Sequence, residues 1–366
     1  AGGTIVVVNA STVRSDALVI TSQAIRLIRL RNFDVTKVRE WLVEIRSWSS
    51  EPRNPERFGR QNTRYRAFLV WLWKNCVRDI LKEIGYSTPP STTDRPRIWW
   101  VGTGVASSLP FHAAGTHSQG STSNTFSRAI SSYAPTLRAL IHAKGRATEF
   151  LTGSRPKHNL LLATMETTPG FRRLYGALAE ADAVQEAVGV EHRITHRKQQ
   201  NAEAVLRLMS SHDIFHFAGH GDSDPADPSG SCIILEKADP TSHLAVEDPL
   251  CVRDLFEADF QPAFLAFLSA CSTAENQHHL LADESIHLVS GFLVAGFRHV
   301  VGCLWPSSDE VCVQVAREFY RALGLQDGKE VRDETVARAL HAAVEKVRAT
   351  RPHHPLLWAQ YVHVGA

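Results

Sequence analysis

Apolar runs of strand length alternate with helical patterns in the second half of the chain. The runs lie at Asn159–Thr164, residues 213–217, residues 264–268 and His299–Cys303, and the helical patterns lie at 174–188, 201–210, 284–296 and 309–324. Short, continuous apolar runs between helices are typical of parallel strands that are buried on both faces. The pattern therefore predicts an α/β fold, a mostly parallel sheet flanked by helices on both faces.

The first half has a different pattern. Two short apolar runs, Thr4–Asn9 and residues 17–20, predict a hairpin at the edge of a sheet. Apolar residues then recur with helical spacing over 35–48 and 65–84, and residues 97–101 have the pattern of another strand. We therefore expect two subdomains, an N-terminal accessory subdomain at residues 1–155 and a second subdomain at residues 156–366.

Composition and charge narrow the class of protein. The chain has 366 residues, is 43% hydrophobic and carries 40 basic against 38 acidic side chains. Without a dense basic run, neither a nucleic-acid footprint nor a membrane surface patch is expected, and a protein or peptide is the expected partner. Six cysteines without paired spacing fit a reducing compartment, and no apolar run approaches the ~20 residues of a membrane span. We expect a cytoplasmic protein; the absence of an initial Met suggests a piece of a longer one.

Two of the strand-like runs end in loops of small residues that carry a reactive side chain. His220 follows residues 213–217, and Cys271 follows residues 264–268. Carboxyl ends of neighbouring parallel strands meet at one edge of a sheet. A thiol with a pKa of about 8.5 is mostly unionised at neutral pH, so that a cysteine nucleophile needs a base such as imidazole. The sequence predicts a hydrolase with this pair, in which the backbone N–H groups of Gly221 and Cys271 bind the oxyanion.

A metal site is the main alternative interpretation of the histidines. His212, His216 and His220 recur every fourth residue, which on a helix would place three ligands on one face. The surrounding residues are strand-like, and no His-Glu-x-x-His motif occurs. We therefore expect no metal and no cofactor, and interpret His216 as a buried neighbour in the strand.

Other candidate nucleophiles have weaker support. Ser269 is not part of a Gly-x-Ser-x-Gly turn, so that a serine hydrolase is not favoured. The cysteines that lie in apolar surroundings are interpreted as small core residues: Cys232, Cys251, Cys303 and Cys312.

The segments His-Phe-Ala-Gly-His-Gly, ending at Gly221, and Leu-Ser-Ala-Cys-Ser-Thr-Ala, around Cys271, together resemble the CHAT domain, a caspase-like peptidase module related to separase. Further matching segments lie at 109–114, 132–137, 283–287, 291–300, 304–306, 319–320 and 355–359. The resemblance implies a cysteine endopeptidase with a His220/Cys271 dyad and a pseudo-protease-like first half. It also implies an upstream repeat domain or an activating protein as partner, and the motif forms look like fungal members.

The resemblance also implies a specificity pocket. In separase-like relatives an acidic residue shortly after the tryptophan that matches Trp305 lines the pocket for a basic side chain, and Asp309 stands at the matching place. Asp222 and Glu310 would add negative charge to the cleft. The alternative for Asp309 is a helix N-cap, a role shared with Ser307 or Ser308. The alternative for the whole protein is a catalytically silent CHAT scaffold that binds a protein through the same cleft.

Overall fold

The computed structural model describes residues 3–48, 54–90, 95–150, 158–189, 192–222, 224, 227–256, 258, 260, 263–270, 288–305, 308–327 and 331–366. The chain divides into two compact units. Unit 1 comprises Ala1–Thr136, His279–Ser285 and Glu345–Gln360, and unit 2 comprises the remainder. The subdomain boundary expected at residue 155 falls in 151–157, outside the described residues, and stays a prediction.

Unit 1 contains strands in the order β3-β2-β1-β4-β5. β1 (Thr4–Asn9) pairs antiparallel with β2 (Asp16–Ile20), which confirms the predicted hairpin. β3 (Ile25–Arg29) extends the pair, and β4 (Arg97–Thr103) and β5 (Ile130–Tyr133) follow in parallel. The sequence analysis did not predict β3, whose apolar residues are interrupted by Arg26 and Arg29 and are mostly exposed.

One helix of unit 1, the second along the chain, begins earlier than the apolar pattern predicts. α1 (Val35–Ser47) agrees with the expectation, but α2 (Pro55–Leu72) starts ten residues before position 65. Asn54 caps α2 by accepting a hydrogen bond from Glu56 N–H, and Pro55 occupies the first helical position, where its missing N–H costs nothing. A π-helical turn, Trp73–Val77, separates α2 from α3 (Arg78–Glu83). The remaining helical pieces are short: Gly104–Ser108, Phe111–Ala113 and α11 (Pro355–Trp358).

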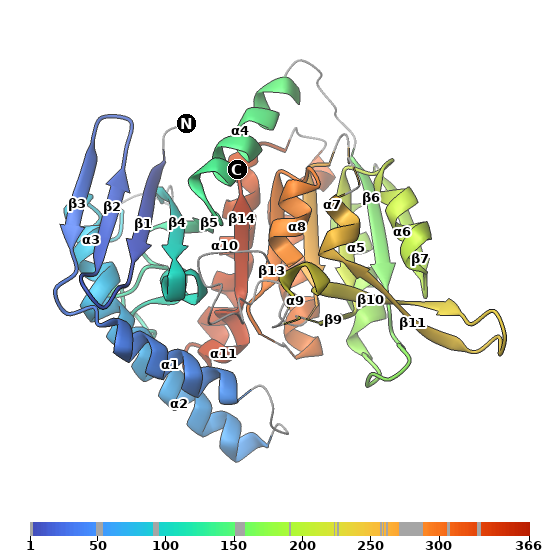
Figure 1. Ribbon diagram of the computed structural model, residues 1–366, viewed down its shortest axis with the longest axis horizontal. Coiled ribbons are helices and arrows are strands. Elements are labelled where there is room, and N and C mark those ends of the chain that lie inside the picture. Colours follow the sequence, from blue (N-terminus) through green and yellow to red (C-terminus); the bar gives the residue numbers. More distant parts are fainter. Residues whose placement is uncertain are drawn as a thin grey trace. The chain divides into compact units, whose positions relative to one another are not determined.

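Unit 2 contains a mostly parallel sheet with the order β14-β13-β12-β8-β6-β7 (Figure 1). All neighbours are parallel except β14, which runs antiparallel to β13. The four strands predicted from the second half of the sequence are all present, as β6 (Asn159–Thr164), β8 (Ile214–Ala218), β12 (Leu265–Ser269) and β13 (His299–Cys303). The sheet also contains β7 (Arg193–Lys198) and β14 (Tyr361–Gly365).

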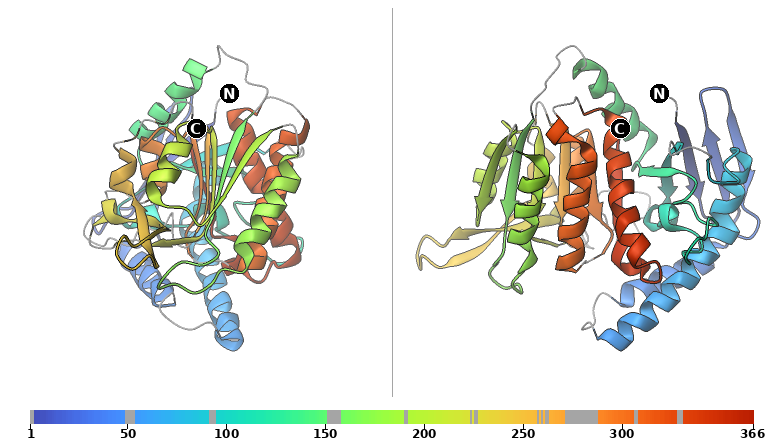
Figure 2. Two further views of the ribbon diagram at one scale, coloured as in Figure 1. Left: turned by 90° about the vertical axis from the view of Figure 1, so that its right-hand side faces the viewer. Right: turned by 180° about the vertical axis from the view of Figure 1, so that it is seen from behind.

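Helices cover both faces of this sheet. Figure 2 shows α5, α9 and α10 on one face and α4, α6 and α8 on the other, as the alternating pattern predicted. Their bounds are α4 (Leu137–Phe150), α5 (Gly176–Val188), α6 (Ala202–Met209), α7 (Val252–Phe256), α8 (Leu288–Val294), α9 (Asp309–Leu323) and α10 (Asp333–Thr350), with short 3-10 turns at Pro228–Gly230 and Leu325–Asp327. Among the described residues, no helix has both the length and the apolar character needed to cross a membrane.

A second, antiparallel sheet of unit 2 has the order β11-β10-β9. β9 (His220–Asp222) follows β8 after one residue, and β10 (Cys232–Ala238) and β11 (Ala245–Cys251) form a hairpin. Ser231 C=O accepts from Val252 N–H and Asp239 N–H donates to Leu244 C=O. The backbone N–H and C=O groups of the odd-numbered residues of β10 therefore hydrogen-bond to β11, and those of the even-numbered residues point toward β9.

The end of β14 requires glycine. Gly365 has φ +122°, and a Cβ atom there would lie 2.2 Å from the carbonyl oxygen of Arg298. Because both the backbone angle and the contact exclude a side chain, we expect Gly365→Ala to cost about 2 kcal/mol or more and to lower the melting temperature by at least about 4 °C. Thermal unfolding followed by circular dichroism measures this.

Gly59→Ala is the matched control for that substitution. Gly59 lies inside α2 with open space around its Cα, so that alanine raises helix propensity without a clash. We expect an unchanged or slightly higher melting temperature. Equal melting temperatures for Gly365→Ala and the wild type would contradict the account of this strand end.

Candidate active site

The carboxyl ends of β8 and β12 lie side by side. Ala218 pairs with Ser269 in register, and Gly219 N–H donates to the carbonyl oxygen of Ser269 at 3.3 Å. His220 follows at once on the β8 side, and Ala270 is the last described residue on the β12 side. Cys271, the predicted nucleophile, lies outside the described residues. The topology therefore brings the ends of the two predicted strands to one edge of the sheet, as expected.

The imidazole of His220 has a defined tautomer. Its Nε2 lies 2.7 Å from the carbonyl oxygen of Arg172, and a carbonyl only accepts, so that Nε2 carries the proton. Nδ1 is then the basic nitrogen, and no described residue donates to it. Burial lowers the pKa of His220, and the charge of Arg172 lowers it further, whereas the hydrogen bond to Arg172 and the charge of Asp309 raise it. The side chain is thus a neutral base at neutral pH.

A compact loop between β6 and α5 holds this histidine in place. Phe171 lies against the imidazole ring with centroids 4.8 Å apart. The loop is closed by Leu174 N–H donating to Glu166 C=O at 2.8 Å, and Arg173 bonds the Glu166 carboxylate at 2.7 Å. These contacts hold the backbone carbonyl of Arg172, which accepts the hydrogen bond from His220 Nε2–H, in a fixed position.

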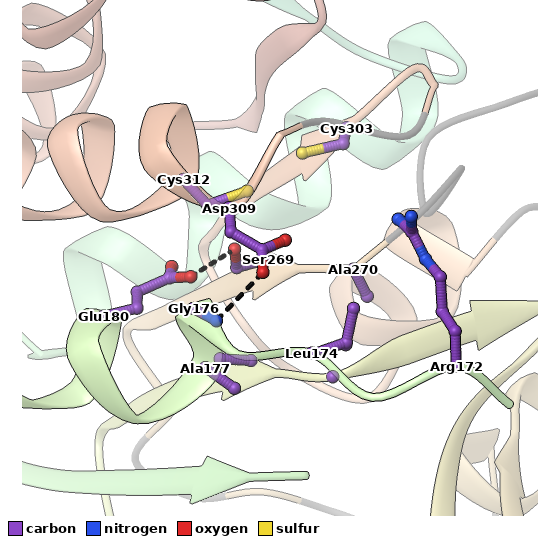
Figure 3. Close-up of a pocket in the computed structure, with 12 residues that line it drawn as sticks. Arg172, Leu174, Gly176, Ala177, Glu180, Ser269, Ala270, Cys303, Asp309 and Cys312 are labelled. Atoms are coloured by element: carbon purple, nitrogen blue, oxygen red, sulfur yellow. Dashed lines mark hydrogen bonds between the residues drawn. The ribbon is translucent and has the colours of Figure 1, made fainter. Parts of the chain in front are cut away.

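A pocket opens beside the two strand ends (Figure 3). Its volume is about 470 Å³ when the open space at its mouth is included. Its walls come from the loop before α5, from α5 itself, from the ends of β8, β12 and β13, and from the start of α9. The lining residues are Arg172, Leu174, Gly176, Ala177, Glu180, Ala218, Gly219, Ser269, Ala270, Cys303, Asp309 and Cys312.

Asp309 lines this pocket and does not cap its own helix. Its Oδ2 accepts a hydrogen bond from the backbone N–H of Gly176 at 2.9 Å, across to the start of α5. Ser308 is the N-cap residue of α9, and its side chain makes no capping hydrogen bond. The N-cap alternative for Asp309 is therefore wrong, because Asp309 occupies the first helical position and its carboxylate bonds a different helix. No described residue donates to Oδ1.

A second carboxylate, Glu180 of α5, lies at the floor of the pocket. It is only 2% exposed, and its Oε2 accepts from the Ser269 hydroxyl at 2.9 Å. Its Oε1 lies 3.2 Å from Nε2 of His216, whose Nδ1 lies 3.2 Å from the Tyr320 hydroxyl. His216 is thus a fully buried neighbour in β8, as predicted, and it belongs to a polar network that ends at Ser269, two residues before Cys271.

The other predicted site residues do not line the pocket. Gly221 lies opposite Ile233, an odd-numbered residue of β10, so that its N–H points away from β10 and is not used in that pairing. Asp222 and Glu310 are exposed and are not among the pocket-lining residues. Their predicted role in substrate binding stays a prediction. His212 bonds Leu208 C=O and the Thr195 hydroxyl, away from His220.

The described residues offer no site for a metal ion. Within the described parts of the chain, no group of three or more His, Cys, Asp or Glu side chains is arranged to hold a metal ion.

Sequence reasoning missed two features of the site. Arg172 acts through its backbone carbonyl, which leaves no trace in the residue type. Glu180 has a detectable signal: it lies on the helix face that also carries the buried Ala177 and Val184, where an acidic residue is out of place unless it has partners.

The family model of the CHAT domain matches residues 66–366. No curated protein matches the chain. Among solved structures, the Saccharomyces cerevisiae separase–securin complex aligns with a TM-score of 0.65 at 11% identity, covering 99% of this chain and 30% of the separase chain. The Arg-specific cysteine proteinase gingipain R aligns with a TM-score of 0.49 at 11% identity, covering 82% of this chain and 73% of that one.

The likeness to separase agrees with the architecture, a mostly parallel sheet with helices on both faces. This chain spans about 30% of the separase chain, so that the likeness to separase establishes the fold of this region alone. With the family model extending over most of its length, the chain belongs to the CHAT domain family and has a caspase-like, cysteine-peptidase-like fold.

Proposed function

We propose that this CHAT domain is a cysteine endopeptidase in which His220 is the base and Cys271 the nucleophile. The observation that carries the proposal is the state of His220: its Nε2 proton is committed to Arg172 C=O, and its Nδ1 has no donor among the described residues. A buried imidazole with one nitrogen fixed and the other open is what proton abstraction from a thiol needs.

The expected reaction has two stages. Nδ1 takes the Cys271 proton, and the thiolate attacks the peptide carbonyl to form a tetrahedral intermediate. Nδ1 then returns the proton to the leaving amine, and water hydrolyses the thioester. The Gly221 N–H, which the pairing with β10 leaves unused, and the Cys271 N–H are the proposed donors to the oxyanion.

We propose that the pocket binds a basic side chain on the amino-terminal side of the cleaved bond. Asp309 has one carboxylate oxygen bonded to Gly176 and the other without a donor, and an arginine or lysine side chain would supply donors and positive charge. Glu180 adds a buried carboxylate at the floor. The substrate is then a protein or peptide, and an upstream repeat domain or activating protein would control access to it.

The first prediction concerns the reactivity of Cys271. At pH 6 an ordinary thiol with a pKa of about 8.5 is about 0.3% ionised, whereas a thiol paired with an imidazole is much more reactive. We expect wild-type Cys271 to be alkylated by iodoacetamide at pH 6 at least about tenfold faster than in His220→Ala. Intact-mass analysis and peptide mapping identify the cysteine that reacts. His142→Ala, an exposed histidine on α4, serves as control.

The pH profile of that reaction has a predicted direction. Because burial lowers the pKa of His220, the acid limb lies below about 6.5, the ordinary histidine value. Arg172→Gln removes a charge that lowers this pKa and shifts the limb to higher pH, and Asp309→Asn shifts it to lower pH. Slow alkylation with the profile of a free thiol, unchanged in His220→Ala, would favour the catalytically silent scaffold.

The second prediction concerns specificity. We expect Asp309→Asn to lower kcat/KM for substrates cleaved after arginine or lysine by about tenfold to a hundredfold, because the substrate cation loses its charged partner. A peptide library profiled with wild type and variant measures this. Glu310→Gln, the adjacent acidic residue outside the pocket, should change the profile less. A wild-type preference for small or apolar residues at that position would sink the assignment.

The third prediction concerns the floor of the pocket. Glu180→Ala leaves the Ser269 hydroxyl and His216 without their buried partner, which costs about 2–5 kcal/mol. Ser269→Ala removes only the hydrogen bond that holds the end of β12, so we expect slower Cys271 alkylation with a smaller loss of stability. Glu186→Ala, on the same helix but exposed, is the control and should cost at most about 1 kcal/mol. Wild-type alkylation rates in both Glu180→Ala and Ser269→Ala would show that the network does not position Cys271.

A further inference from the structure

Cys232 and Cys251 face each other across the β10–β11 hairpin. They are register partners in an antiparallel pair. Because the odd-numbered residues of β10 bond to β11, Cys232 and Cys251 form a non-hydrogen-bonded pair. Opposite Cα atoms in such pairs are about 4.5 Å apart with their side chains close together, within the range that a disulfide spans.

The two thiols occupy a small environment of their own. They are 6% and 7% exposed and form a hydrophobic cluster with Ile234. Burial and the neighbouring Cys251 raise the pKa of the Cys232 thiol to about 12. The charge of Arg253 opposes this rise in the pKa of Cys232.

The pair is next to the strand that carries His220. Cys232 lies opposite Asp222, and Ile234 lies opposite His220. Side chains of register partners, and of residues two apart in a strand, share one face of a sheet. The row Cys251–Cys232–Asp222 therefore runs beside the row that ends in His220, on the same face. A disulfide between Cys232 and Cys251 would draw β10 toward β11 and so change how Ile234 packs against His220.

We propose that Cys232 and Cys251 are a redox-active dithiol whose disulfide locks the β9–β10–β11 sheet and changes the surroundings of His220. The oxidant is a hydroperoxide. The thiolate of one cysteine of the pair attacks a peroxide oxygen of hydrogen peroxide, the O–O bond breaks, and a sulfenic acid and water form. The sulfur of the other cysteine then attacks the sulfenic sulfur, forming the S–S bond and releasing a second water. The dithiol loses two electrons and two protons, and one peroxide becomes two waters.

The other cysteines that the structure describes lie in different parts of the fold. Cys76 is buried in unit 1, and Cys303 and Cys312 line the pocket. Burial also makes the reaction slower than at an exposed thiolate, which suits a response to sustained oxidation. The inference does not depend on peptidase activity, and its test reads covalent linkage and the state of His220 only.

Peptide mapping tests the linkage. The reduced full chain is treated with hydrogen peroxide, alkylated and digested with trypsin, which cleaves after Lys237 and so separates the two cysteines unless a disulfide joins them. We expect the linked peptides Cys232–Cys251 as the main disulfide, converted back by dithiothreitol. The linkage is lost in Cys232→Ser and kept in Cys303→Ser. Recovery of both cysteines as alkylated thiols, or linkage mainly to other cysteines, would overturn the proposal.

Nuclear magnetic resonance of the histidine side chains tests the coupling. The His220 signal, assigned by its loss in His220→Ala, is expected to move between the reduced and oxidised wild-type chains and to stay in place in peroxide-treated Cys232→Ser. A complete disulfide with an unmoved His220 signal would overturn the link between this pair and the site.

Discussion

The structure of the site depends on the alignment of two parallel strand ends, β8 and β12. The register of Ala218 with Ser269 and the hydrogen bond from Gly219 to Ser269 place the two following residues at one edge of the sheet. One strand continues into β9 with His220, and the other leads through Ala270 toward Cys271. A slip of the register by one residue would turn the buried side chains of β12 to the other face, so that the site and the core of unit 2 are specified together.

Polar groups around these strand ends divide into committed and available ones. The committed ones are Nε2 of His220, one oxygen of Asp309 and Oε2 of Glu180, which have hydrogen-bond partners inside the protein. The available ones are Nδ1 of His220 and the second oxygen of Asp309. Asp309 lines the pocket, and His220 directly follows Gly219, which also lines it. These two available groups are the ones that the proposed reaction and the proposed binding of a basic side chain would use.

Much of this arrangement could be predicted from the sequence, because β8 and β12 are buried on both faces and read as continuous apolar runs. Small loop residues then marked His220 and Cys271 at their ends. β3 and β7 could not be found in this way, since neither is a continuous apolar run: arginines interrupt the apolar residues of β3, and β7 is mostly polar. The position of Asp309 followed from the resemblance, but its bond to Gly176 needed the packing of α5 against α9. The Arg172 carbonyl and the Cys232–Cys251 pair depend on backbone position and strand register, which residue types do not reveal.

The measurement that tests the central claim most directly is a crystal structure of the chain after reaction with a peptidyl-arginine acyloxymethyl ketone. The account predicts a covalent bond to Cys271 Sγ, with Nδ1 of His220 within hydrogen-bonding distance of that sulfur and the arginine side chain at Asp309. A bond to another cysteine, or a Cys271 adduct with His220 still remote from the sulfur and the arginine outside the pocket, would contradict it.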